Sequence, residues 1–173
     1  TPKLGAGKVS DWEYLGMCSS ALIHDGHGYV VTNRGEVICF DLDGMADGND
    51  GPFMDEATYM SKGLDGQSNE PLVEPGPQDA DIIWGFDIRT ELGVFPHNVT
   101  SSSVTTDGEK IYVSPSNGVD WSHINIPVPN APTMVALDIK TGELVGEEAA
   151  GISKNIMHCN WSSPGFVEHN DKP

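Results

Sequence analysis

The sequence has no long apolar run, so it predicts no helix that crosses a membrane. No uninterrupted apolar stretch in the 173 residues approaches the roughly 18 residues that such a helix needs. Cysteine is scarce as well: Cys18, Cys39 and Cys159 form no Cys-x-x-Cys pair and no adjacent pair. This odd, scattered set argues against a disulfide framework and against a zinc knuckle, while a single disulfide stays open.

Basic residues are also few. Nine Lys and Arg stand against 26 Asp and Glu, which gives a formal net charge of −17. A surface this acidic repels a phosphate backbone, so we expect no binding to nucleic acid. The same charge suits a soluble surface, divalent cations, or a basic protein partner such as a small cytochrome.

A repeat of three similar segments runs through the chain. Its copies begin at Cys18-Ser19-Ser20-Ala21, at Thr100-Ser101-Ser102-Ser103 and at Trp161-Ser162-Ser163-Pro164. Asp25-Gly26 and Asp107-Gly108 follow in the first two copies, and Asp-Gly between apolar runs is a strong signal for a tight β-hairpin. The 20 Gly and 12 Pro agree with this interpretation, because they favour many short elements separated by turns.

Each of the first two repeats predicts four short strands. The expected strands are 18–24, 28–33, 36–41 and 81–87, then 100–105, 110–115, 133–138 and 143–148. Recurring groups of four antiparallel strands predict an all-β β-propeller, with about two blades plus the start of a third. A β-sandwich with a chance echo of the repeat is the alternative. The predicted ranges are blade one at 17–87 with an insertion at 44–80, blade two at 99–148 with an insertion at 116–132, and the next blade at 160–173.

A complete propeller has four to eight blades. We therefore expect residues 1–173 to be a partial propeller, a fragment whose direct partners are the remaining blades. The chain begins with Thr1 rather than Met, which we interpret as a sign of processing, trimming or a cut from a longer chain.

The second repeat carries the phrase Ala136-Leu137-Asp138-Ile139-Lys140-Thr141-Gly142-Glu143-Leu144-Val145. It resembles the repeat of pyrroloquinoline-quinone-type propellers, Ala-x-Asp-x-x-Thr-Gly-x-x-x-Trp, with Gly146 in place of the Trp that docks one blade on the next. The resemblance implies the quinoprotein alcohol dehydrogenase-like superfamily, a bacterial source and an extracytoplasmic location, periplasmic or secreted. The chain lacks the adjacent cysteines and the haem-attachment motif of many quinone-using members. The resemblance therefore implies the propeller more than it implies bound quinone (PQQ).

The first insertion opens on a candidate calcium loop. Asp41, Asp43, Asp47, Asn49 and Asp50 offer oxygen ligands within ten residues, and the intervening glycines let the chain bend. The order of acids does not follow the EF-hand pattern. The alternative is a turn-rich loop without an ion.

Histidine and tryptophan provide the other candidate sites. His97 and His158 each lie four residues before the first Ser of their repeat, so they are expected at equivalent depths in successive blades. They are candidates for a metal or redox site, and a structural hydrogen bond is the alternative. Trp121, in the second insertion, is a candidate for stacking on a sugar or a flat cofactor, against the alternative of packing on the next blade.

The sequence thus predicts an extracytoplasmic propeller segment that acts as a binding or scaffold platform. One alternative is part of a PQQ-dependent, calcium-assisted alcohol or sugar dehydrogenase that passes electrons to a cytochrome. A second alternative is a carbohydrate-binding propeller. No catalytic residue is assigned.

Overall fold

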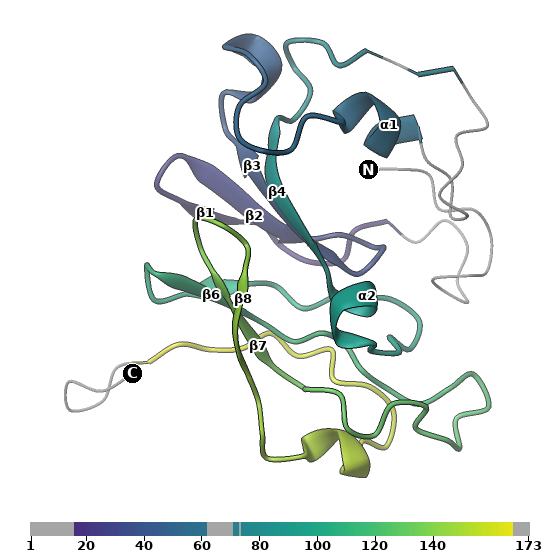
Figure 1. Ribbon diagram of the computed structural model, residues 1–173. Helices are drawn as coiled ribbons and strands as arrows, with labels where there is room; N and C mark the ends of the chain where they lie inside the picture. Colours follow the sequence, from purple (N-terminus) through teal and green to yellow (C-terminus); the bar gives the residue numbers. More distant parts are fainter. Residues whose placement is uncertain (1–15, 62–70, 73, 168–173) are drawn as a thin grey trace.

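The chain folds mainly into β-structure, arranged as two four-stranded antiparallel sheets with a few short helices (Figure 1). The computed structural model describes residues 16–61, 71–72 and 74–167. The predicted insertion at 44–80 and the predicted start of the third blade therefore lie partly outside the described residues. The all-β prediction is confirmed.

The first sheet contains the strands of the first repeat in sequence order. These are β1 (Leu22–His24), β2 (His27–Val31), β3 (Glu36–Asp41) and β4 (Ile82–Asp87). Asp25 and Gly26, with φ of 48° and 77°, make the two-residue turn between β1 and β2, as Asp-Gly predicts for a tight hairpin. The expected first strand is shorter than predicted, because pairing with β2 begins only at Leu22.

The second sheet repeats this order with shorter strands. It consists of β5 (Thr105–Thr106), β6 (Lys110–Val113), β7 (Val135–Asp138) and β8 (Leu144–Glu147). The turn between β7 and β8 is built by Asp138, whose side chain accepts hydrogen bonds from the backbone N–H groups of Lys140 and Thr141, both at 2.9 Å. Gly142 completes this turn at φ 72°, a conformation that favours glycine.

Four short helical segments complete the described fold. They are η1 (Gly44–Ala46), α1 (Glu56–Ser61), α2 (Ile88–Leu92) and η2 (Ile152–Asn155). Helix α2 directly follows β4 because the Asp87 side chain caps the N–H groups of Arg89 and Thr90, and Gly93 ends the helix at φ 63°. No helix among the described residues is long and apolar enough to cross a membrane.

One hydrophobic core joins the two sheets, since its buried side chains come from both. Trp84 of β4 marks the contact most clearly. A methyl group on Gly142 would lie 2.4 Å from the Trp84 indole, so the ring lies directly on the turn between β7 and β8. The absence of a side chain at Gly142 is what lets the two sheets approach here.

Serine hydroxyls connect the starts of the three repeats. The N–H of Ser20 donates to Oγ of Ser103 at 2.9 Å, and the N–H of Ser103 donates to Oγ of Ser163 at 2.8 Å. The three segments therefore lie in sequence order, each bonded to the next. The Val31 N–H donates to Oγ of Ser19 and the Ser114 N–H to Oγ of Ser102. Ser102 is thus the structural counterpart of Ser19. The sequence repeat had aligned Ser19 with Ser101, which is one residue away.

A candidate metal centre of three histidines

Three histidines that are far apart in the sequence meet in one cluster. His97 lies before the second repeat, His123 in the second insertion and His158 before the third repeat start. One ring nitrogen of each lies within 4.8 Å of the others. The ring centroids are 4.6 Å apart for His97 and His123, 4.5 Å for His97 and His158, and 5.1 Å for His123 and His158.

His97 is the fixed member of this cluster. Its side chain is fully buried, and its Nδ1 lies 2.9 Å from the carbonyl oxygen of Val119. A carbonyl oxygen only accepts hydrogen bonds, so Nδ1 carries a proton, and Nε2 is the ring nitrogen that can offer a lone pair to a metal. That Nε2 is buried and has no hydrogen-bond partner within the described part of the chain. In metal-ligating histidines, one ring nitrogen binds the metal and the N–H of the other usually donates to a backbone carbonyl or a carboxylate, as Nδ1 of His97 does here.

Gly118 allows the segments that carry His97 and His158 to come together. It bridges to Cys159, while the N–H of the next residue, Val119, donates to the His158 carbonyl at 2.8 Å. A Cβ on Gly118 would lie 2.5 Å from the His158 carbonyl oxygen and 2.9 Å from Cβ of His97. Only glycine fits this approach without moving backbone.

Asn117 anchors the base of the second insertion beside the cluster. Its buried side chain accepts from the N–H of Phe95 at 3.0 Å and donates to the carbonyl of Val128 and the hydroxyl of Ser153. One amide group thus ties together the segment before His97, the end of the insertion and η2. This fixes where the insertion leaves and rejoins the sheet.

A tight turn places His123. The N–H of His123 donates to the carbonyl of Asp120 at 2.9 Å, and His123 itself has a φ of 61°. The Asp120 carboxylate accepts hydrogen bonds from the Ser122 hydroxyl and from the Asn125 side chain. These hydrogen bonds lower the pKa of Asp120 to about 2, and the bond from Ser122 has the largest effect. The carboxylate therefore stays ionised and holds the turn closed in neutral solution.

Aromatic rings border the cluster. Trp161 lies 4.9 Å from the His158 ring, edge to face, and its indole N–H lies within hydrogen-bonding distance of the carbonyls of His97 and Val99. Trp121, the residue predicted to stack on a ligand, is 51% exposed and packs edge-on against Phe95 with 5.9 Å between ring centroids. Its outer face remains open to solvent.

Cys159 lies next to His158 but outside the cluster. Its thiol donates to the carbonyl of Ser116 at 2.9 Å. Burial raises the pKa of this thiol to about 12, so it stays protonated in neutral solution. All three cysteines are unpaired, so the disulfide left open by the sequence does not form in this structure.

The geometry of the cluster fits a divalent transition metal. Imidazole nitrogen suits Zn²⁺, Cu²⁺ and Ni²⁺. A tetrahedral Zn²⁺ with bonds of about 2.05 Å places its nitrogen ligands roughly 3.3 Å apart. His123 and His158 are exposed, so their rings can make that closure by rotation while His97 stays in place. Three protein ligands leave a fourth position for water or another ligand, as in catalytic zinc sites.

The predicted calcium loop divides into two parts. The side chains of Asp41, Asp43 and Asp47 bring carboxylate oxygens within 4.8 Å of one another at the surface, where exposed acids often gather without an ion. The Asn49 side chain instead donates to Glu56, and Asp50 is exposed, with only its backbone N–H bonded to Asp81. The structure therefore does not bring the five predicted ligands into one group.

Sequence reasoning named His97 and His158 but not His123. The repeat relates the first two, and the structure brings their rings together. His123 belongs to an insertion that has no counterpart in the other repeats, so the repeat could not point to it.

The comparisons with known proteins give no relative for this chain. No family model, no curated protein and no solved structure matches it.

Proposed function

We propose that this chain is part of a quinoprotein-like β-propeller that acts as an extracytoplasmic binding platform and holds a divalent transition-metal ion between His97, His123 and His158. The observation that carries the metal site is the Nε2 of His97, which is buried and has no hydrogen-bond partner among the described residues, while Nδ1 of the same ring is held by a backbone carbonyl. A buried nitrogen lone pair without a partner costs roughly 1–3 kcal/mol. A metal ion offsets that cost.

Two contacts support the propeller part of the proposal. The serine hydrogen bonds link each repeat start to the next one along the chain, as expected for blades that follow one another around an axis. Trp84 packs on Gly142 of the next repeat, which is the role that the resemblance implies for a docking tryptophan. A β-sandwich has no reason to repeat one such hydrogen bond between three consecutive segments.

The remaining blades complete such a platform, and the acidic surface suits a basic partner such as a cytochrome. The quinone-dependent dehydrogenase and the carbohydrate-binding propeller stay predictions from the sequence.

Metal titration tests the proposal directly. Isothermal titration of the chelator-treated chain with Zn²⁺ is expected to show one tight site, and His97→Gln is expected to weaken it at least 100-fold. His24→Gln is the matched control, because His24 lies at the end of β1 and outside the cluster. Equal Zn²⁺ affinity in the chain and in His97→Gln would refute the metal centre.

A further inference from the structure

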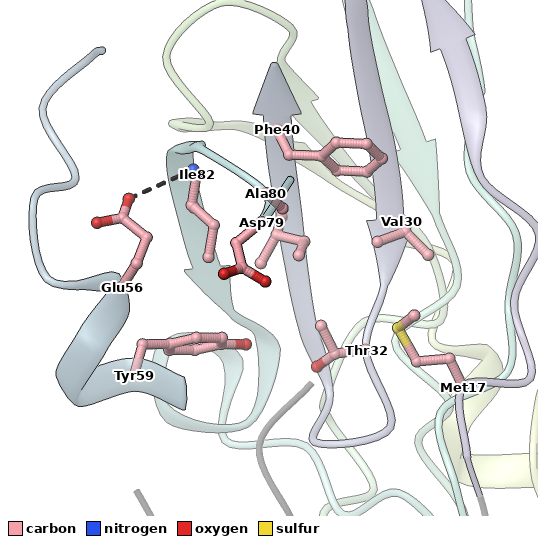
Figure 2. A pocket seen from close by; sticks show the side chains of 10 residues that line it. Met17, Val30, Thr32, Phe40, Glu56, Tyr59, Asp79, Ala80 and Ile82 are labelled. Atoms are coloured by element: carbon pink, nitrogen blue, oxygen red, sulfur yellow. Dashed lines mark hydrogen bonds between the residues drawn. The ribbon is translucent and has the colours of Figure 1, made fainter. Parts of the chain in front are cut away.

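Two acidic side chains are buried side by side at the edge of the first sheet. Glu56 is the first residue of α1 and is only 2% exposed, while Asp81 lies directly before β4 and is fully buried. An oxygen of Glu56 accepts from the N–H of Ile82, the residue after Asp81, at 3.3 Å (Figure 2). Both carboxyl groups belong to segments beside β4 of the first sheet, whereas the three histidines lie in loops before and after strands of the second sheet.

The donors around these acids are neutral groups. The Asn49 amide donates to Glu56 at 2.8 Å, and the N–H of Asp50 donates to Oδ2 of Asp81 at 2.8 Å. Within the described ranges, none of the ion pairs includes Glu56 or Asp81. The two carboxylates are therefore buried without a compensating positive charge from a described residue.

Two buried oxygens here also lack hydrogen-bond partners among the residues that the structure describes. They are Oδ1 of Asp81 and Oδ1 of Asn49. Because the Nδ2 of the same Asn49 amide bonds to Glu56, this unpaired oxygen lies close to the acid pair, and a half-turn of the amide would point it at the carboxylates. Each unsatisfied oxygen costs free energy, and two like charges in a buried place repel each other.

Either a shared proton or a bound cation can relieve this arrangement. Burial raises the pKa of Asp81, which shows the cost of holding it ionised here. A shared proton would satisfy one carboxyl oxygen but would leave Oδ1 of Asn49 without a donor. A cation satisfies all of these oxygens together and balances the charge.

We propose that Asp81, Glu56 and Asn49 bind a calcium ion that fastens α1 and the loop after β3 to the start of β4. Carboxylate and amide oxygens are hard ligands, which Ca²⁺ accepts in flexible coordination, with backbone carbonyls and water completing its shell. The site differs from the surface group of Asp41, Asp43 and Asp47, because its two carboxylates are buried and its ligands come from three separate segments.

A thermal unfolding experiment on the full chain, treated first with chelator, tests this site. Ca²⁺ at 100 times its Kd is expected to raise the melting temperature by roughly 5–10 °C. Asp81→Asn, a substitution of the same shape, is expected to abolish this shift. Asp43→Asn removes an exposed carboxylate and is expected to keep it.

The outcomes separate this site from the alternatives. No shift with Ca²⁺ in the unmodified chain would overturn the proposal in favour of a shared proton. If Asp43→Asn loses the Ca²⁺-induced shift in melting temperature while Asp81→Asn keeps it, calcium binds in the surface group, and the proposed buried site is refuted as well. A cooperative unfolding transition in the same thermal experiment shows that the Asp81→Asn variant is folded. His97→Gln should keep the full Ca²⁺ shift, so either site can fail without the other.

Discussion

Substituting Gly118 by alanine should weaken metal binding without removing a ligand. The new Cβ would lie 2.5 Å from the His158 carbonyl oxygen, about 0.9 Å short of the 3.4 Å at which ordinary contact begins. Its other near neighbours are Cβ of His97 and Cβ of Cys159, at 2.9 and 3.0 Å, so no flexible side chain can move aside. The backbone that carries His158 must shift by nearly 1 Å.

That shift exceeds what a metal centre tolerates. Metal–ligand distances hold within about 0.2 Å, and changes to groups that support ligands typically cost 10- to 100-fold in affinity. We therefore expect Gly118→Ala to weaken Zn²⁺ binding by roughly 10- to 100-fold. Overpacking at this buried position should also lower the free energy of unfolding by about 1–3 kcal/mol.

Gly146→Ala is the matched control for this experiment. A Cβ on Gly146 meets only Cβ of Ala136 at 3.9 Å, which is ordinary contact, and Gly146 lies in β8 away from the histidines. Isothermal titration measures the Zn²⁺ affinity of both variants, and urea unfolding measures their stability. If Gly118→Ala binds Zn²⁺ as tightly as the unmodified chain, the close approach does not position the ligands. An equal loss in Gly146→Ala would point to a general effect on folding.

Three further results are expected. Gly142→Ala drives a methyl group into the indole that packs on it from β4, at a φ of 72°, so urea unfolding should show a loss of about 1–3 kcal/mol or more. Hydrogen bonds, of which the one from Ser122 has the largest effect, lower the pKa of Asp120 to about 2. The ionised Asp120 carboxylate therefore stabilises the fold fully above about pH 4, and this contribution disappears as the pH falls toward 2. The difference in unfolding free energy between the chain and Asp120→Asn should follow that course, and a constant difference would contradict it. Native thiol labelling should modify the exposed Cys18 quickly and the buried Cys39 slowly, since burial raises the pKa of Cys39 to about 11. Equal rates would contradict the burial.

The sequence predicted the strands better than their contacts. Strand β4, expected at 81–87, is found at Ile82–Asp87, because a run of apolar and aromatic residues ends there at a capping Asp. The repeat alignment was one residue off at the second serine, because hydrogen bonds set that register and they depend on neighbouring segments. The bend that brings Asn49 toward Glu56, away from the surface aspartates, could not be read from composition, since most residues of the loop are polar or small.

The sequence by itself determined most of the β-strands, the tight Asp25-Gly26 turn and the Asp138–Gly142 turn, while the strand expected at 100–105 forms only at Thr105–Thr106. These follow from alternation, from residues that accept positive φ, and from side chains that bond to their own backbone, all of which are local. Tertiary structure alone decided that His97, His123 and His158 share one place, and that Glu56 and Asp81 are buried together. These groupings of side chains depend on how separate segments pack, for example on the close backbone approach at Gly118. No local sequence pattern specifies such packing.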